Sequence, residues 1–513
     1  MNQAWSRLQD GTILAGALIA GSALWLTGDH SVDNLAVILL SVGSAAAVAW
    51  LSPSRPVAAF GILFLMTTLS AFTVSTPLGN MRLEQPAIVA GYAALLLAPS
   101  GLGLSRLRPL LPIGAAFGLY LVCLGLSSVF FSVDRVDSLR MTFWTGLSMS
   151  GGLLAFLLLA RSNTRATELM LASGYVQALT GILCAVLFFS LGPVLVAGPF
   201  PAPGVAQPLG SLAKVFALSW EPNLYASLLA ALTIIGFNRL LSAGRVADKI
   251  LVPVMAAAIA VGVTRGAYLG LAAGLAVYVL LAVGHTRLWS GQSMRRVGVQ
   301  GAVIIGSLVA GVLVSAILMQ GGRAPTKPLD FTQPGWGRGV AAVASGQPGS
   351  PGSPGSPGSK PTAPPALNQV PPPDTVTFRL DRIPVAIADL RQSPLIGLGA
   401  NSFGQRHTDI SQNAPDHLAI LALAALYESG VLGAAGLGIG FALVLWAFFR
   451  ATRRRSDRGM IAAYAGALAS LLVAYEATNA LNFALIWLIA GAGLAAASEP
   501  QDAVEGLTAP LRG

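Results

Sequence analysis

Residues that could do chemistry are few in this chain, and they stand in short polar stretches between long apolar runs. Four stretches carry most of them: "WEPN" at 220–223, "TRGA" at 264–267, "SPLIGLGANSFGQRH" at 393–407 and "YEATNALN" at 475–482. Arg265, in the second stretch, has no acidic residue near it in sequence. A guanidinium group has a permanent charge on a planar fork, which suits two-point binding of a phosphate. Arg265 therefore indicates either a phosphate site or an arginine that extends from the membrane to its interface.

The composition is that of a membrane protein. Of 513 residues, 54% are hydrophobic and 10% are charged, whereas a soluble domain has about 25% charged residues. Apolar runs of about 20 residues recur, each long enough to cross about 30 Å of hydrocarbon as a helix. We expect an all-α polytopic membrane protein of about 14 transmembrane helices, with about 12 as the lower bound. The expected centres lie near residues 20, 43, 66, 92, 120, 151, 178, 227, 257, 276, 308, 441, 468 and 489.

The basic residues predict the topology. They fall on every second connection between the apolar runs, as the positive-inside rule requires. We therefore expect both termini in the cytoplasm and the four polar stretches on the outer side. This placement accounts for the net charge of +10 without a nucleic-acid partner. Arg82, Arg135 and Arg140 are exceptions on outer connections, each with an acidic residue close by. The inner basic residues are Arg55, Arg106, Arg108, Arg161, Arg165, Arg239, Arg245, Lys249, Arg287, Arg295, Arg296 and the run at 450–458.

The hydropathy pattern and low-complexity segments divide the chain into five regions. They are N-terminal transmembrane helices (1–215), central helices with the WEPN and TRGA stretches (216–319), an extracytoplasmic loop (320–417), C-terminal transmembrane helices (418–498) and a cytoplasmic tail (499–513). Within the loop, 345–375 is rich in Pro, Gly and Ser and is expected to be a disordered linker. Residues 376–417 are expected to be the ordered part that carries chemistry.

The ordered part of the loop predicts a short amphipathic helix on the outer membrane surface. Its apolar stripe is Ile383, Val385, Ile387 and Leu390, surrounded by charged residues. Pro394 ends it, and the glycines at 397 and 399 allow a tight turn. The following stretch, 418–450, is too long for one direct crossing. The polar "YESG" at 427–430 should divide it, which places Glu428 near the outer interface.

These motifs together resemble the O-antigen ligase and O-antigen polymerase superfamily. The resemblance covers about residues 210 to 490 and rests on "RLDRIPVAIADLRQSPLIGLGANSF", His417, "YESGVLG", "TRGAYLGL" and "EPNLYASLLA". Arg379 lies fifteen residues before Pro394, as in the family pattern. Four features depart from that pattern: Leu418 follows the histidine, Gly430 comes thirteen residues after it, Thr264 stands where Ser is common, and Ile383 stands where Trp is common. Either the loop has two extra residues, or His417 is not the family's histidine and His407 takes its place.

The resemblance implies a GT-C-like glycosyltransferase or ligase in the bacterial plasma membrane, active in polysaccharide and lipopolysaccharide synthesis for the cell envelope. The donor would be a glycan on undecaprenyl diphosphate, and the acceptor a hydroxyl of a lipid- or wall-linked glycan. Arg265 and Arg379, with Arg382, would bind the departing diphosphate. His417 would be the base, since a neutral imidazole takes up protons near neutrality.

Other residues of the polar stretches would assist. Glu221, Glu428 or Glu476 would orient the base, and Asn223 would line the substrate site. The sequence has no metal–nucleotide, Walker or HExxH motif, so we expect a transferase without metal or cofactor. "GLAAG" at 270–274 indicates helix packing and not a nucleotide site.

Three other functions remain open. A repeat-unit polymerase would use the same chemistry with a diphosphate-linked acceptor. A transporter or flippase would place ionisable residues and broken helices at the bilayer midplane in both halves, whereas here the polar residues gather at the outer ends. The third is a membrane protein that binds glycans without catalysis.

Overall fold

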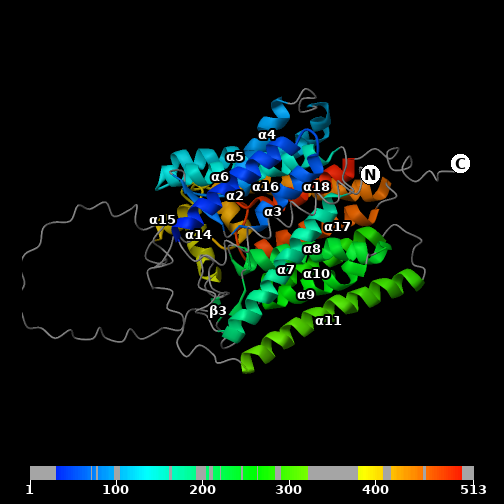
Figure 1. Ribbon diagram of the computed structural model, residues 1–513. Helices are drawn as coiled ribbons and strands as arrows, with labels where there is room; N and C mark the ends of the chain where they lie inside the picture. The colour runs from blue at the N-terminus through cyan, green and yellow to red at the C-terminus, as the bar shows by residue number, and fades with distance from the viewer. Residues whose placement is uncertain are drawn as a thin grey trace, which may run out of the picture.

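The structure is a computed structural model, and it is almost entirely helical (Figure 1). It describes residues 30–70, 72–76, 79–97, 104–160, 165–191, 204–206, 212–215, 217–219, 221–243, 246–262, 264–283, 291–321, 379–407, 418–454 and 458–498. The expected span near residue 20, the linker at 345–375, His417 and the tail at 499–513 lie outside these ranges. The elements, contacts and burial of the protein are those of the described residues.

The first part of the chain forms six α-helices, one 3₁₀ helix and a hairpin within the described ranges. The elements are α2 (His30–Leu51), α3 (Pro56–Thr68), β1 (Thr73–Thr76), β2 (Gly79–Arg82), α4 (Glu84–Leu97), η1 (Leu104–Leu110), α5 (Leu111–Phe130), α6 (Arg135–Leu159) and α7 (Ala166–Leu191). The antiparallel β1–β2 hairpin pairs Thr73 with Arg82 and Thr76 with Gly79. It connects α3 to α4.

The second part contains a second short hairpin and the helices of the outer loop. The elements are β3 (Gly204–Ala206), β4 (Leu212–Lys214), α8 (Pro222–Ala243), α9 (Val246–Val261), α10 (Arg265–Val283), α11 (Gly291–Gly321), α14 (Arg382–Leu390), α15 (Ser402–Arg406), α16 (Leu421–Arg454), α17 (Arg458–Tyr475) and α18 (Ala484–Ser498). The helix expected in the loop is thus present as α14, and "TRGA" marks the start of α10.

Eight of the described helices are long and apolar enough to cross a membrane. They are Leu107–Phe130, Arg135–Leu159, Ala166–Val186, Pro222–Ser242, Arg265–Ala282, Arg295–Val314, Leu421–Arg454 and Arg458–Tyr475. Each expected centre from 43 to 489 falls within a helix, but α2, α3, α4 and α18 offer only shorter apolar segments, and α9 has 16 residues. The α-helical membrane fold is therefore supported, and the larger count of about 14 stays a prediction.

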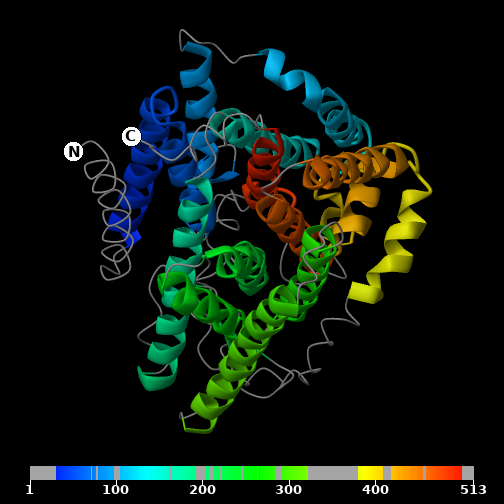
Figure 2. The ribbon, with the colours of Figure 1, turned by 90° about the vertical axis from the view of Figure 1, so that its right-hand side faces the viewer.

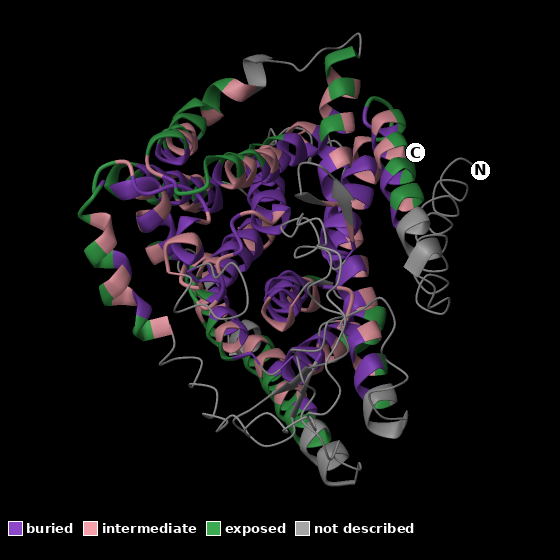
Figure 3. Ribbon diagram, turned by 90° about the vertical axis from the view of Figure 1, so that its left-hand side faces the viewer, coloured by how far each residue is buried: buried purple, intermediate pink, exposed green. Residues whose placement is uncertain are grey.

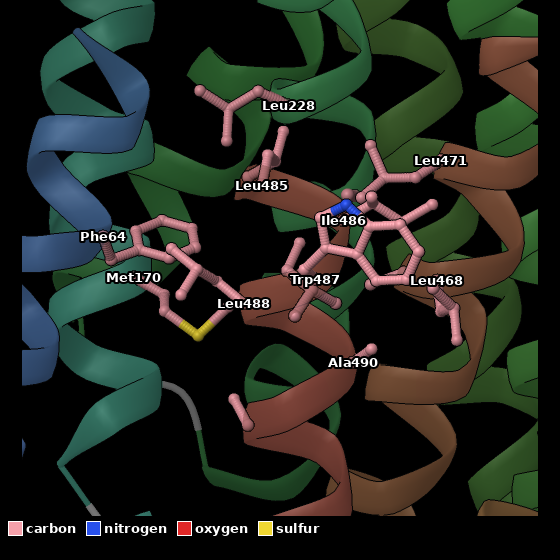
Figure 4. Close-up of a cluster of buried hydrophobic side chains, with 14 of the residues drawn as sticks. Phe64, Met170, Leu228, Leu468, Leu471, Leu485, Ile486, Trp487, Leu488 and Ala490 are labelled. Atoms are coloured by element: carbon pink, nitrogen blue, oxygen red, sulfur yellow. The ribbon is translucent and has the colours of Figure 1, made fainter. Parts of the chain in front are cut away.

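Helix α18 lies at the centre of the hydrophobic core. Every residue from Ala484 to Ala496 is buried, and Figure 3 shows that the buried residues concentrate in the inner helices. Figure 4 shows Trp487 and Leu488 of α18 among side chains of four other helices. The labelled neighbours are Phe64, Met170, Leu228, Leu468 and Leu471. Because α18 is apolar all round, it suits a position enclosed by other helices.

Glycines bring α10 and α17 into close contact. A β-carbon on Gly270 would lie 2.5 Å from the Ser470 carbonyl oxygen, and one on Gly274 would lie 2.5 Å from that of Gly466. Neither position has room for a side chain, so the two backbones can approach as small residues allow in membrane helices. The interpretation of "GLAAG" as a packing motif is confirmed.

Peripheral helices expose apolar side chains to their surroundings. Helix α11 runs along the edge of the molecule (Figure 2). Only 11% of its most apolar stretch, within Arg295–Val314, is buried. Its exposed residues include Val299, Ile305 and Val309. Such a surface is expected of a helix that lies against lipid.

Candidate active site

The polar connections come together at one end of the helical assembly. Hydrogen bonds join Arg82 of β2 to the connection between α17 and α18, and Glu221 before α8 to the same connection. Asp134, before α6, bonds Gln405 of α15. At the other end, Arg239 of α8 pairs with Asp248 of α9 at 3.2 Å. Arg239 and Glu221 thus lie at opposite ends of α8, and the assignment of these ends to the two sides of a membrane stays a prediction.

Four candidate residues belong to segments near the turn after α17: Glu221, Arg379, Arg265 and Glu476. Thr478 donates a hydrogen bond of 2.5 Å from its hydroxyl to Glu221 Oε1. Glu221 in turn acts electrostatically on Arg379: burial lowers the pKa of the Arg379 guanidinium, and the Glu221 carboxylate opposes that shift. Arg379 is half-buried. A half-buried guanidinium can bind an anion such as a diphosphate.

Arg265 approaches the same turn from another side. It is the first residue of α10 and is exposed, while the next residue, Gly266, packs against the turn. A β-carbon on Gly266 would lie 2.6 Å from the Ala477 β-carbon and 3.2 Å from the Ala474 carbonyl oxygen. The start of α10, with Arg265 as its first residue, therefore packs against the turn in which Thr478 bonds Glu221.

Glu476 has a structural part in this arrangement. Its Oε2 accepts a hydrogen bond of 3.2 Å from the backbone N–H of Ala422, in the first turn of α16. Partial burial raises the pKa of Glu476, and the N–H of Ala422 opposes this. The carboxylate satisfies one of the N–H groups that a helix start leaves free. This hydrogen bond therefore links the turn after α17 to the start of α16.

Arg82 and Glu84 form an ion pair that connects the hairpin to this turn. Their closest atoms are 3.9 Å apart. The Arg82 guanidinium also donates a hydrogen bond of 2.5 Å to the Asn482 carbonyl and lies 3.6 Å from the centre of the Phe483 ring. Ser148 of α6 donates to the same carbonyl at 2.7 Å. Arg140 likewise pairs with an acidic residue close by in sequence, Asp137.

The glycine-rich stretch after α14 joins its backbone to α16 at a break in that helix. Gly430 has φ 67° and ψ −174°, which interrupts α16 where "YESG" predicts a break. The N–H groups of Val431 and Leu432 bond the carbonyls of Pro394 and Leu395. Further, the N–H groups of Leu398 and Gly399 bond the carbonyls of Tyr427 and Glu428. The loop thus provides hydrogen-bond partners for backbone groups on both sides of the break in α16.

Glu428 lies inside this junction. Its Oε1 accepts a hydrogen bond of 3.1 Å from the backbone N–H of Asn401, which has a left-handed conformation with φ 55°. The Glu428 carbonyl accepts a further bond of 2.6 Å from Ser127 of α5. These contacts are those of a residue that holds α15 against α16.

A second group of side chains connects α14, α15 and α16. His407 Nε2 lies 2.6 Å from Asp389 Oδ2, and the Tyr427 hydroxyl donates to the same oxygen at 2.8 Å. Phe403 packs beside the imidazole, with ring centres 4.9 Å apart. Since one ring nitrogen is bound by a carboxylate, the imidazole is oriented, as in enzymes that use histidine as a base. Sequence reasoning did not single out Asp389 or Tyr427.

Arg382 and Asn223 complete the placement of the predicted residues. Arg382 is only 3% exposed, on the side of α14 that faces the protein. Its guanidinium carbon lies 5.9 Å from the centre of the Phe403 ring. Asn223 lies half-buried in the first turn of α8, two residues after Glu221. In the part of the chain that the structure describes, no three His, Cys, Asp or Glu side chains gather as a metal site would need.

Comparison with known proteins adds no name to this geometry. No model of a known protein family matches the chain, and no curated protein is significantly similar to it.

Proposed function

We propose that this chain transfers a glycan from a polyprenyl-diphosphate carrier to the hydroxyl of an acceptor sugar, at the outer face of a bacterial plasma membrane. The observation that carries the proposal is that the start of α10, with Arg265, packs against the turn after α17, where Thr478 bonds Glu221, the carboxylate that acts on Arg379. Two guanidinium groups at the end of a membrane-embedded bundle suit a ligand with two adjacent phosphates near the membrane surface.

The chemistry needs little more than charge stabilisation and one base. The acceptor oxygen attacks the anomeric carbon, and the bond from that carbon to the diphosphate oxygen breaks with its electron pair on the diphosphate. Arg265 and Arg379 stabilise the developing negative charge. The acceptor proton passes to an imidazole, for which His417 is the first candidate and His407, held by Asp389, the second.

Transfer by the purified protein in vesicles, with a lipid-linked glycan and an acceptor glycan, tests the proposal. Arg265→Ala and Arg379→Ala should each lower the rate about 100-fold or more, as loss of one stabilising donor does in other enzymes. Arg135→Ala is the matched control, because this arginine is exposed at the start of α6 and belongs to neither candidate group. Wild-type rates in both site variants would contradict the proposal. His417→Ala and His407→Ala then separate the two candidate bases.

Deletion of the gene distinguishes this function from its alternatives. Full-length lipid-linked glycan should accumulate at the outer face if the chain is a ligase. Single repeat units would instead favour the polymerase, which uses the same chemistry. Material trapped on the inner leaflet would indicate a flippase and contradict the proposal, while unchanged glycans with retained binding would indicate a non-catalytic protein.

A further inference from the structure

Helix α14 carries its charged residues on the inside and apolar residues on the outside. Arg382 is 3% exposed, and Asp389 is bonded to His407 and Tyr427. Leu380 and Ile387, by contrast, are 55% and 49% exposed. The sequence predicts the helix with Ile383, Val385, Ile387 and Leu390 as its outer apolar stripe, but of these four only Ile387 is exposed. It also does not predict that two charged residues face the protein.

The exposed residues share one face of the helix. Asp381 and Arg391, on either side of α14, also have helical backbone angles, so the helical spacing extends from Leu380 to Arg391. At 3.6 residues per turn, positions 380, 384, 387 and 391 lie along one side. All four are exposed: two aliphatic residues, a proline and, at the end, an arginine. A helix with charged residues toward the protein and aliphatic residues exposed on its outer side is expected where hydrocarbon, and not water, surrounds that side.

The apolar face continues onto a helix that crosses the membrane. The chain from Ser393 folds directly back onto α16, where the Leu432 N–H bonds the Leu395 carbonyl at 3.0 Å. Leu395 is 60% exposed, and Val431 and Leu432 at the start of the second half of α16 are 50% and 44% exposed. Leu432 belongs to a candidate membrane span, so α14 and Leu395 adjoin the surface that this span presents to lipid.

We propose that the face of α14 formed by Leu380, Pro384 and Ile387, together with Leu395, is a lipid-docking surface that lies in the outer leaflet of the bilayer. Helix α14 stands at the periphery of the molecule (Figure 2), where a lipid layer can reach it. Arg391 at the end of this face lies at the depth of the phosphate headgroups, which attract a guanidinium. The continuity with α16 favours lipid over a soluble partner or a second copy of the chain.

The docking surface has a consequence for the neighbouring arginine. Arg379 lies three residues before α14, so a membrane-anchored α14 holds it at headgroup depth. This consequence, unlike the docking surface itself, rests on the proposed function, because only a lipid-linked diphosphate needs an arginine at that depth.

Spin labels on α14 test the surface directly. The native cysteines, Cys123 and Cys184, are both buried and can be replaced by alanine. Single labels are then placed through Leu380→Cys, Ile387→Cys and the buried control Ala386→Cys, in vesicles of phosphatidylethanolamine and phosphatidylglycerol. Labels at 380 and 387 should collide more often with oxygen, which concentrates in hydrocarbon, than with a water-soluble nickel chelate. The label at 386 should meet neither.

Two results would overturn the proposal. Preferential collision with the nickel chelate at 387 would place the face in water, and protection from both reagents at 380 and 387 would mean that protein covers it. A pair of charged variants gives a readout that does not depend on a label. Ile387→Glu should lower the unfolding temperature in vesicles by several degrees more than Ala388→Glu, which adds the same charge at an exposed residue beside that face. Equal effects would count against lipid docking.

Neither measurement depends on glycan transfer. Lipid contact at 380 and 387 in a protein without transferase activity would leave the docking surface intact and remove only the proposed function.

Discussion

The backbones of Gly397 and Gly430 meet where the loop after α14 crosses the break in α16. A β-carbon on Gly397 would lie 2.5 Å from the carbonyl oxygen of Glu428, and one on Gly430 would clash with the backbone of Leu395. Both glycines also have positive φ angles, 82° and 67°. The two motifs "PLIGLG" and "YESG" are therefore two halves of one junction, which fixes the ordered part of the loop to a membrane helix.

Alanine at either glycine should destabilise the protein strongly. The left-handed backbone costs about 1 to 3 kcal/mol for a residue with a side chain, and the steric clash adds to this. Gly438→Ala is the matched control: it lies in α16 with no atom near its missing β-carbon. The control should be neutral, or stabilising by up to about 1 kcal/mol. Thermal unfolding in detergent measures the differences, and equal unfolding temperatures for Gly430→Ala and Gly438→Ala would contradict the junction.

The helices could be predicted because each depends on local sequence. A run of apolar residues long enough to cross hydrocarbon specifies a helix wherever it packs, and the expected centres from 43 to 489 lie in helices for this reason. The break at Gly430 was also predictable, since a polar tetrapeptide with glycine interrupts an apolar run. The number of full spans was not, because α3 and α4 have only 13 and 14 helical residues, fewer than their hydropathy suggests.

The candidate site was predictable only in part, because long-range partners decide what each residue does. Sequence reasoning treats three glutamates as equal candidates to orient the base. The structure distinguishes them: Glu428 and Glu476 accept backbone N–H groups, whereas Glu221 accepts from the Thr478 hydroxyl and acts electrostatically on Arg379. Arg82, Asp389 and Thr478 gain their partners from segments that sequence spacing cannot pair. Arg382, which is expected to bind diphosphate, is buried on the side of α14 that faces the protein. Arg379 is half-buried and is therefore the stronger candidate.

The ion pair of Arg82 and Glu84 should show strong coupling in a double-mutant cycle. Arg82→Met alone leaves the Glu84 carboxylate buried without its cation and should cost about 3 to 5 kcal/mol. Adding Glu84→Gln should recover much of that loss, because the buried charge is gone. The half-exposed pair of Arg140 and Asp137 is the control: Arg140→Met should cost about 1 kcal/mol or less, because Asp137 keeps its hydrogen bonds from Asn401 and Gln405. Additive losses for the two substitutions at 82 and 84 would show that the pair is not coupled.

Removal of Asp389 should loosen α14 and α15 without unfolding the rest of the protein. Asp389→Ala deletes the acceptor for both His407 and Tyr427, and hydrogen bonds to a charged group contribute about 1.5 to 3 kcal/mol each. Hydrogen–deuterium exchange should therefore rise across residues 382–407 and stay unchanged in α17 and α18. Asp381→Ala is the control, because this exposed carboxylate makes no side-chain hydrogen bond to the start of the helix. The same exchange in both variants would exclude a positioning role for Asp389.

Thr478 should act on transfer through Glu221. Thr478→Val keeps the side-chain volume but removes the hydroxyl that donates to Glu221 Oε1, so the carboxylate beside Arg379 loses its fixed position. A hydrogen bond to a charged group contributes about 1.5 to 3 kcal/mol, and its loss should lower kcat/KM about 10- to 100-fold. Thr478→Ser restores the donor and should restore the rate, which a purely steric role would not require. Thr452→Val, which removes a buried hydroxyl near the far end of α16, should leave the rate unchanged. If Thr478→Val transfers glycan as fast as Thr452→Val, Glu221 does not position Arg379.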